Sequence, residues 1–283
     1  MPSYVLTMSC PDRTGIVAAL TAFIAERNGL ITEAAHFVDE FSDRSFMRTS
    51  FRGDALPAIE VLKGEFAPVA ERFSMDWGLH LAETRMKVLV AVSQQGHCLN
   101  SLLHRWSIGT LPIDIMGVVS NHDTHRSLAE WHGLRFHHYP IEKGRKVEQE
   151  ARILELFDRT ESELLVLARY MQVLTAEACA RLAGRCINIH HSFLPGFKGA
   201  KPYHQAYERG VKIIGATAHY ATTDLDEGPI IEQDVQRVDH TMLPDDLTEI
   251  GHDLEAVVLN RAVRWHAEHR VFVTGNRTVV LRS

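Results

Sequence analysis

The sequence predicts a two-part α/β protein: a small unit of strands and helices over residues 1–84, followed by a doubly wound parallel sheet over residues 85–283. Three observations support this fold class. Short apolar segments alternate with amphipathic helical segments along most of the chain, which is the pattern of sheets covered by helices. The order of these segments changes near residue 84. The length of 283 residues, 45% of them hydrophobic, is sufficient for two cores.

The first unit follows the order strand, helix, strand, strand, helix, strand. Its expected strands are residues 3–10, 30–39, 44–53 and 75–82, and its expected helices are residues 16–29 and 55–73. In the first helix the apolar residues fall on one face, and Gly29 is placed to end it. This βαββαβ order is that of the ferredoxin-like fold.

In the second unit, continuous apolar strands are each followed by a helical segment. The expected strands are residues 86–93, 113–121, 134–141, 162–171 and 186–192, and the expected helices are residues 98–106, 125–133, 146–160 and 175–184. A further strand carries His219, and another begins within residues 228–233. This alternation predicts a Rossmann-like, doubly wound parallel sheet. Ligands bind such sheets beyond the carboxyl ends of the strands.

Composition argues against several classes of function. The formal net charge is −6 and the basic residues are scattered among acids, which argues against a nucleic-acid surface. No apolar run is long enough to cross a bilayer, and the first residues lack the features of a signal peptide. The four cysteines are widely spaced, and the 17 histidines show no tight ligand spacing. We therefore expect a cytoplasmic protein that binds no membrane, nucleic acid or metal.

Polar residues at one strand end indicate where chemistry could occur. Asn188, His190 and His191 belong to a strand that is expected to be buried, where unpaired polar groups are costly. They stand at its carboxyl end, beside the expected crevice. Asn188 and His190, together with Asp226 in a later acidic loop, also have purely structural explanations. Asn188 could bridge backbone groups, His190 could be a hydrogen-bonded core histidine, and Asp226 could simply form a turn.

Four short motifs occur in a fixed order in the second unit. They are Asn188-Ile189-His190, Ser192-Phe193-Leu194-Pro195, Thr217-Ala218-His219 and Asp226-Glu227-Gly228-Pro229. Together they resemble the folate-dependent formyltransferase family, which carries N-x-H, S-x-L-P, S/T-x-H and D-x-G-P and uses 10-formyltetrahydrofolate. The resemblance covers nearly all of residues 85–283 and implies the formyltransferase fold for them.

The resemblance also implies the residues of the site. The catalytic residues would be Asn188, His190 and Asp226, with His219 holding Asp226 or its loop from behind. The pterin ring of the folate would lie against the main chain of residues 169–174. The implied folate-binding residues are Met171, Gln172, Val173, Leu174, Ala221 and Thr222. The folate is then the substrate, and no cofactor is implied.

These residue types suit the hydrolysis of a formamide. An amide N–H of Asn188 and an imidazole N–H of His190 can stabilise the oxyanion that develops on the formyl group. Asp226 can orient a water molecule and pass a proton to the departing nitrogen. Ser192 lacks the G-x-S-x-G setting of a serine hydrolase, so we expect water to attack directly.

The formyl acceptor depends on the loop after the first strand of the second unit. In the members of the formyltransferase family that formylate glycinamide ribonucleotide, this loop is rich in Gly and Ser and binds a phosphate. Here it carries Gln94, Gln95 and His97 around a single Gly96. We therefore expect hydrolysis of 10-formyltetrahydrofolate to tetrahydrofolate and formate. The resemblance implies that this reaction supplies formate to purine biosynthesis and balances one-carbon folate pools. Formyl transfer to a small amine, or a non-catalytic folate or amino-acid sensor, are the alternatives.

The segment PDRTGIV, residues 11–17, resembles the ligand turn of an ACT domain, the amino-acid-sensing module of metabolic enzymes. The resemblance implies a regulatory ligand at Asp12, Gly15 and Asn28, with glycine or methionine as the effector, and a homodimer or homotetramer. A helix N-terminus at this turn would favour the carboxylate of an amino acid. Alternatively, Asp12 only caps the helix and Gly15 only permits a tight turn.

Overall fold

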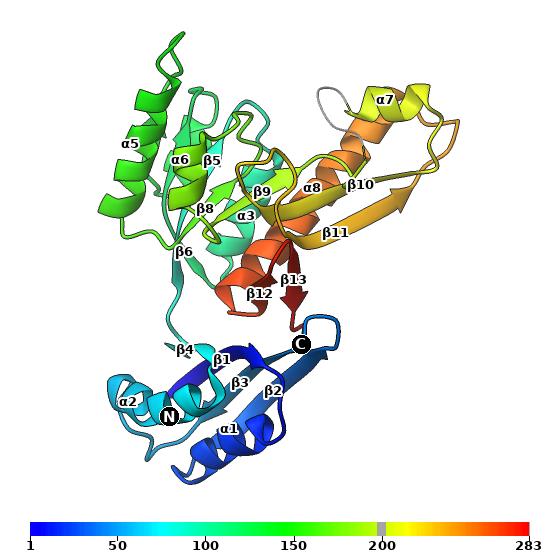
Figure 1. Ribbon diagram of the computed structural model, residues 1–283. Coiled ribbons are helices and arrows are strands. Elements are labelled where there is room, and N and C mark those ends of the chain that lie inside the picture. Colours follow the sequence, from blue (N-terminus) through cyan, green and yellow to red (C-terminus); the bar gives the residue numbers. More distant parts are fainter. Residues whose placement is uncertain (197–201, 283) are drawn as a thin grey trace. The chain divides into compact units, whose positions relative to one another are not determined.

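The computed structural model describes residues 1–196 and 202–282 and divides into two compact units (Figure 1). The first unit comprises Met1–Thr84, Glu268–Thr274 and Val279–Ser283, and the second comprises Arg85–Ala267 and Gly275–Thr278. The predicted division into residues 1–84 and 85–283 therefore differs from the structure at the C-terminus. The reason is that residues 268–274, which are far away in the sequence, pack on the sheet of the first unit. None of the helices in the described part of the chain is long and apolar enough to cross a membrane.

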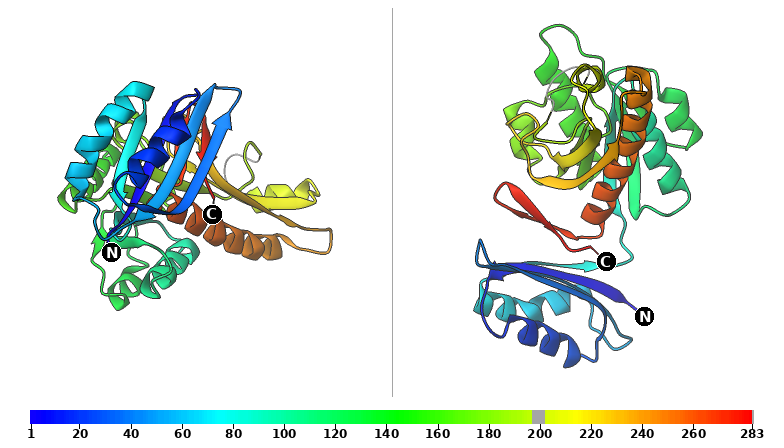
Figure 2. Two further views of the ribbon diagram at one scale, coloured as in Figure 1. Left: turned by 90° about the horizontal axis from the view of Figure 1, so that it is seen from below. Right: turned by 90° about the vertical axis from the view of Figure 1, so that its right-hand side faces the viewer.

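The first unit is a four-stranded sheet covered by two helices on one face (Figure 2). Its strands are β1 (Ser3–Pro11), β2 (Leu30–Asp39), β3 (Arg44–Arg52) and β4 (Asp76–Leu81), paired antiparallel in the order β2-β3-β1-β4. The helices are α1 (Ile16–Ala25) and α2 (Ile59–Phe73). Their apolar faces and the facing sheet residues form one core. The predicted βαββαβ order is confirmed.

Residues near the C-terminus pack on side chains of β2 and β3 that point away from this core. Arg270 donates to the carboxylate of Glu33 at 2.8 Å, and Arg48 donates to the same carboxylate at 2.8 Å. The ring of Phe272 meets that of Phe46 edge-on at 5.7 Å. The segment includes β12 (Val271–Thr274), which pairs with β13 (Arg277–Val280) in a hairpin.

The second unit contains, within the described residues, a seven-stranded sheet in the order β11-β10-β9-β8-β5-β6-β7. The strands are β5 (Met86–Val92), β6 (Ile113–Ser120), β7 (Phe136–His138), β8 (Leu164–Leu167), β9 (Cys186–His190), β10 (Ile213–Tyr220) and β11 (Ile230–Arg237). Strands β5 to β9 pair in parallel, as predicted. Strand β10 is antiparallel to both its neighbours. The chain passes from β10 to β11 without a helix to carry it back, so the pair must be antiparallel.

Helices cover both faces of this sheet. Helices α5 (Lys146–Arg159) and α6 (Ala176–Arg181) pack on one face, and α3 (His97–Ser107) and α8 (Pro244–Ala267) pack together on the other (Figure 1). The shorter helices are α4 (Arg126–Trp131) and α7 (Pro202–Glu208). No element was predicted for residues 244–267, which form α8 in the structure. This doubly wound arrangement leaves the carboxyl ends of the parallel strands open to a ligand.

Candidate active site

A cavity of about 270 Å³ opens at the carboxyl ends of β8 and β9. The loop that follows β10 closes its other side. Its lining includes every site residue that the sequence analysis named in the second unit: Met171, Gln172, Val173, Leu174, Asn188, His190, His219, Ala221, Thr222 and Asp226. Segments far apart in the sequence therefore meet where a doubly wound sheet binds its ligand.

The amide of Asn188 is oriented by a histidine on the neighbouring strand. His219 faces Asn188 in the antiparallel pair of β9 and β10. Nδ1 of His219 lies 3.0 Å from the main-chain oxygen of Tyr220 and can only donate to it. In the neutral ring Nε2 is then an acceptor, and it receives an N–H from Nδ2 of Asn188 at 3.2 Å. The NH₂ group of Asn188 is thereby fixed, with a second N–H left to donate.

Asp226 lies beside both imidazoles. Its Oδ1 is 3.3 Å from Nδ1 of His190 and 3.7 Å from Nε2 of His219. Burial by itself would raise the pKa of the Asp226 carboxyl. Hydrogen bonding to His190 is the largest effect that opposes burial, and this pKa lies well below its usual value. The side chain is therefore a carboxylate at neutral pH, and it fixes the orientation of the His190 ring.

The structural alternatives for these residues are only partly supported. Asp226 does adopt the left-handed backbone conformation of a turn, with φ of 57°. Its carboxylate nevertheless points to His190 instead of capping the turn. Asn188 bonds to the side chain of His219, whereas a staple between backbone groups would need main-chain partners. Polar groups from three segments thus converge on one partly buried space.

Several lining residues were not singled out from the sequence. Leu167, Tyr170, Cys179 and Leu225 supply apolar surface to the cavity. Leu225 is 57% exposed although it is apolar, and Met171 and Val173 are each 53% exposed. Large exposed apolar side chains around a cavity indicate a surface that a ligand covers. The position of Leu225 between two acidic residues was the only sequence signal for its role.

The predicted regulatory residues of the first unit do not all come together. Gly15 precedes α1 with φ of 96°, a conformation that suits glycine. The alternative that Asp12 caps α1 is wrong, because Gly15 holds the cap position and the carboxylate of Asp12 accepts a hydrogen bond from Ser45. Asn28 lies at the other end of α1, roughly 15 Å away by helix length. Asn28, with φ of 55°, takes a left-handed conformation just after α1, one residue before the Gly29 that was expected to end the helix.

Comparisons with known proteins agree with this geometry. The family described as "Formyl transferase" matches residues 86–263. A formyltetrahydrofolate deformylase of Corynebacterium sp. (strain P-1) is 54% identical over 280 residues, covering 99% of this chain and 98% of that protein. One from Escherichia coli (strain K12) is 42% identical and covers 98% of each chain.

Solved structures give the same result. A formyltetrahydrofolate deformylase from Burkholderia mallei superposes with a TM-score of 0.95 at 52% identity, covering 100% of both chains. A glycinamide ribonucleotide transformylase from Symbiobacterium toebii reaches a TM-score of 0.68 at 28% identity, covering 72% of this chain and 98% of that one. The transformylase therefore matches only part of the chain, whereas the deformylase matches both units.

Proposed function

The chain belongs to the formyltetrahydrofolate deformylases of the formyl transferase family, and on that premise we propose how its site performs the reaction. The enzyme hydrolyses 10-formyltetrahydrofolate to tetrahydrofolate and formate, with water as the formyl acceptor. The observation that carries the assignment of the site is the meeting of Asn188, His190 and Asp226 in one cavity with the segment 171–174.

The pterin ring would occupy the part of the cavity next to residues 169–174. Exposed main-chain groups in this segment can read the polar edge of the ring, while Met171, Val173 and Leu225 cover its faces. Apolar walls with a few placed polar groups are typical of small-molecule sites. This position directs the formyl group toward Asn188 and His190.

Asn188 and His190 would stabilise the tetrahedral intermediate. The second N–H of Asn188 donates to the oxygen of the formyl group as that oxygen becomes an anion. His190 can donate to the same oxygen from Nε2 when its ring carries both protons, while its Nδ1–H is held by the carboxylate of Asp226. Because both donors are fixed before substrate binds, little reorganisation is needed during the reaction.

Asp226 would move the proton. Its carboxylate orients the attacking water, accepts a proton as the water adds to the formyl carbon, and passes that proton to N10 as the C–N bond breaks. The low pKa of Asp226 keeps the group ionised in the free enzyme. The developing negative charge on the intermediate raises the proton affinity of the carboxylate at the moment when a proton must be taken.

We also propose the cofactor requirement, the cell compartment, the metabolic role and the regulation of the enzyme. The reaction needs no cofactor, because the folate is the substrate and no electrons are transferred. Four free, buried cysteines favour a reducing cytoplasm. The formate released would serve purine biosynthesis. The first unit would be an ACT domain that binds glycine or methionine, and the enzyme would be a homodimer or homotetramer.

The decisive experiment measures formate release from 10-formyltetrahydrofolate with no amine present. We expect steady release by the wild-type enzyme, and its absence would refute hydrolysis. Asp226→Asn keeps the shape of the side chain but removes the base, so turnover should fall steeply while folate still binds. Loss of folate binding together with activity would instead show that Asp226 mainly orders its loop.

A further inference from the structure

Next to the reaction cavity, the carboxyl ends of β5 and β8 are bridged by hydrogen bonds. The strand order reverses at β5, with β6 on one side and β8 on the other, and ligands bind at such a switch point. Hydrogen bonds join the two strand ends across it. The main-chain N–H of Ser93 donates to the oxygen of Arg169 at 3.2 Å, and that of Met171 donates to the hydroxyl of Ser93 at 3.0 Å.

A cluster of polar side chains lies behind these strand ends, with a buried centre and an exposed outer side. Its centre is Glu255 of α8, which is fully buried. The Glu255 carboxylate contacts Nε2 of His97 at 2.7 Å, the hydroxyl of Tyr203 at 2.7 Å and Nε of Arg169 at 3.3 Å. Gln95 closes the outer side, since its Oε1 accepts from Nε of Arg169 at 3.0 Å. We call Gln95, His97, Arg169, Tyr203 and Glu255 the Glu255 cluster.

The Glu255 cluster reaches the reaction cavity through Arg169. Arg169 and His191 both line that cavity, and Arg169 donates to Nδ1 of His191. The ring of His191 stacks against that of His190, with centroids 5.0 Å apart. Through Arg169 and His191 the cluster is therefore linked to His190, whose Nδ1 lies beside Asp226.

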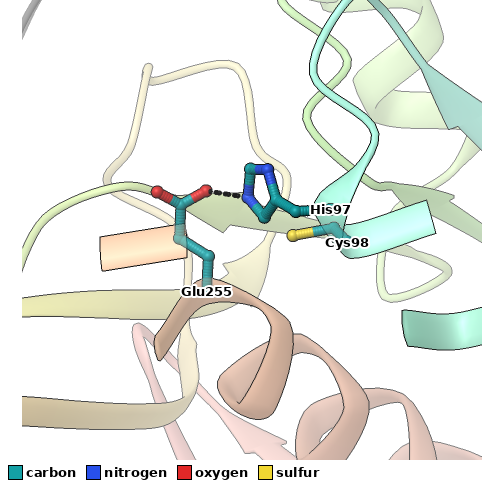
Figure 3. Close-up of side chains that lie close together, drawn as sticks. All are labelled: His97, Cys98 and Glu255. Carbon is teal, nitrogen blue, oxygen red and sulfur yellow. Dashed lines mark hydrogen bonds and ion pairs between the residues drawn. The ribbon is translucent and has the colours of Figure 1, made fainter. Parts of the chain in front are cut away.

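A metal ion is a poor occupant for this cluster. His97, Cys98 and Glu255 do offer ligand atoms within 4.8 Å of one another, and the ring of His97 points at the carboxylate (Figure 3). However, a dication there would meet the guanidinium of Arg169, which already pairs with Glu255. Burial also raises the pKa of the Cys98 thiol well above its usual value, and metals bind the thiolate.

We propose that the Glu255 cluster determines the acceptor of this enzyme, because it occupies the crevice next to the reaction cavity in which an amine would otherwise be held, so that water is the acceptor. This inference rests on the proposed hydrolysis. A water molecule attacking the formyl carbon gives formate after the C–N10 bond breaks and N10 takes a proton. A primary amine at the same position would form a new C–N bond, lose one proton and give the N-formyl amine and tetrahydrofolate. Neither route oxidises or reduces any atom.

The test opens the crevice from its outer side and leaves the buried ion pair of Arg169 and Glu255 in place. The variant is Gln95→Gly with His97→Ser, and the probe amine is glycinamide in large excess. We expect the ratio of formylglycinamide to formate to rise by roughly tenfold or more over wild type, the scale on which pocket changes alter the choice between substrates. The matched control is Gln94→Gly with Asn100→Ser, two exposed positions of the same loop and helix.

The outcomes separate this inference from the proposed function. Wild-type enzyme that releases no formate would refute the hydrolysis itself. Wild-type enzyme that formylates glycinamide readily, or a folded cluster variant whose ratio matches the control, would overturn the role of the cluster. If the double variant does not fold, Gln95→Gly alone provides the test, because it keeps the bond between His97 and Glu255. A ratio no higher than that of Gln94→Gly would then refute the inference.

Discussion

In the proposed mechanism, the amide of Asn188 stabilises the oxyanion in only one of its two orientations. A carbonyl oxygen turned toward the formyl group would repel the developing oxyanion, whereas the NH₂ group stabilises it. The choice is made by His219, whose Nδ1 must donate to the main-chain oxygen of Tyr220 and whose Nε2 therefore accepts from Asn188. His219 thus acts as a positioning residue for Asn188, in addition to its longer contact with Asp226.

Replacing Asn188 tests this role directly. Asn188→Ala should lower kcat by roughly a hundredfold to a thousandfold, the scale for losing one oxyanion donor. The melting temperature should change little, because the lost bond is to a single side chain. The exposed Asn100 on α3 provides a control, and Asn100→Ala should keep full turnover. A loss of less than fivefold in Asn188→Ala would show that Asn188 is structural.

The motif residues could be predicted from the sequence, but their mutual contacts could not. Asn188, His190 and Asp226 were predicted as site residues because short motifs surround them and because polar groups end a buried strand. The contact between Asn188 and His219 depends on the antiparallel register of β9 and β10, which pairs residues 31 positions apart. No local pattern specifies that register, so the orientation of the amide emerges only from the fold.

Helix α8 shows the same limit for a whole element. Its N-terminus carries ordinary signals, with Pro244 at its start and Asp245 and Asp246 in its first turn. Its buried side is harder to recognise, because it includes Gly251, Glu255 and Asn260 among apolar residues. These interrupt the apolar periodicity that marks an amphipathic helix. Gly251 and Glu255 are needed there to admit Tyr203 and to form the Glu255 cluster.

Gly251 is required by the close approach of Tyr203. A Cβ at Gly251 would lie 2.1 Å from the ring of Tyr203, which is buried. Gly251→Ala should therefore destabilise the protein by roughly 1–3 kcal/mol, the usual cost of overpacking. Gly64→Ala in α2 is the control, because a Cβ there meets nothing within 4 Å. That change should stabilise the protein by up to about 1 kcal/mol through helix propensity alone. Denaturant unfolding of both variants measures the contrast, and equal effects would contradict it.

The last turn of α8 makes stability depend on pH. Burial lowers the pKa of His266 from 6.5 to about 4, and its Nδ1 lies 2.6 Å from the hydroxyl of Tyr220. Between these values the unfolded chain binds a proton that the native state does not. Stability is therefore lost as the pH falls from 6.5 toward 4, with a slope of up to about 1.4 kcal/mol per pH unit from this group. His266→Gln can keep a bond to Tyr220 and should flatten this slope in urea unfolding. An unchanged slope would exclude His266 as its source.

At the scale of the whole molecule, the chain contributes to the first unit from both of its ends. The strands and helices of residues 1–84 could be predicted because their periodicities are local. The addition of residues 268–274 could not, because it depends on Arg270 and Phe272 meeting Glu33 and Phe46 more than 200 positions away. Deleting residues 1–84 would therefore remove the partners of Arg270 and Phe272. Point variants, which keep these contacts, are the cleaner test of regulation.

The proposed effector response is tested at the turn before α1. Glycine and methionine should each be titrated against the rate of formate release and the melting temperature of the full-length enzyme. We expect at least one of them to shift both, because an effector acts by binding two conformations or assemblies with different affinity. Gly15→Val should abolish the response, since φ of 96° strains a β-branched residue and distorts the turn. Gly15→Ala provides a milder version, and Gly64→Ala in the same unit should respond as wild type does. If neither amino acid alters rate or melting temperature in the wild-type enzyme, regulation by these two is wrong. The first unit would then serve assembly, and the melting temperature should depend on protein concentration.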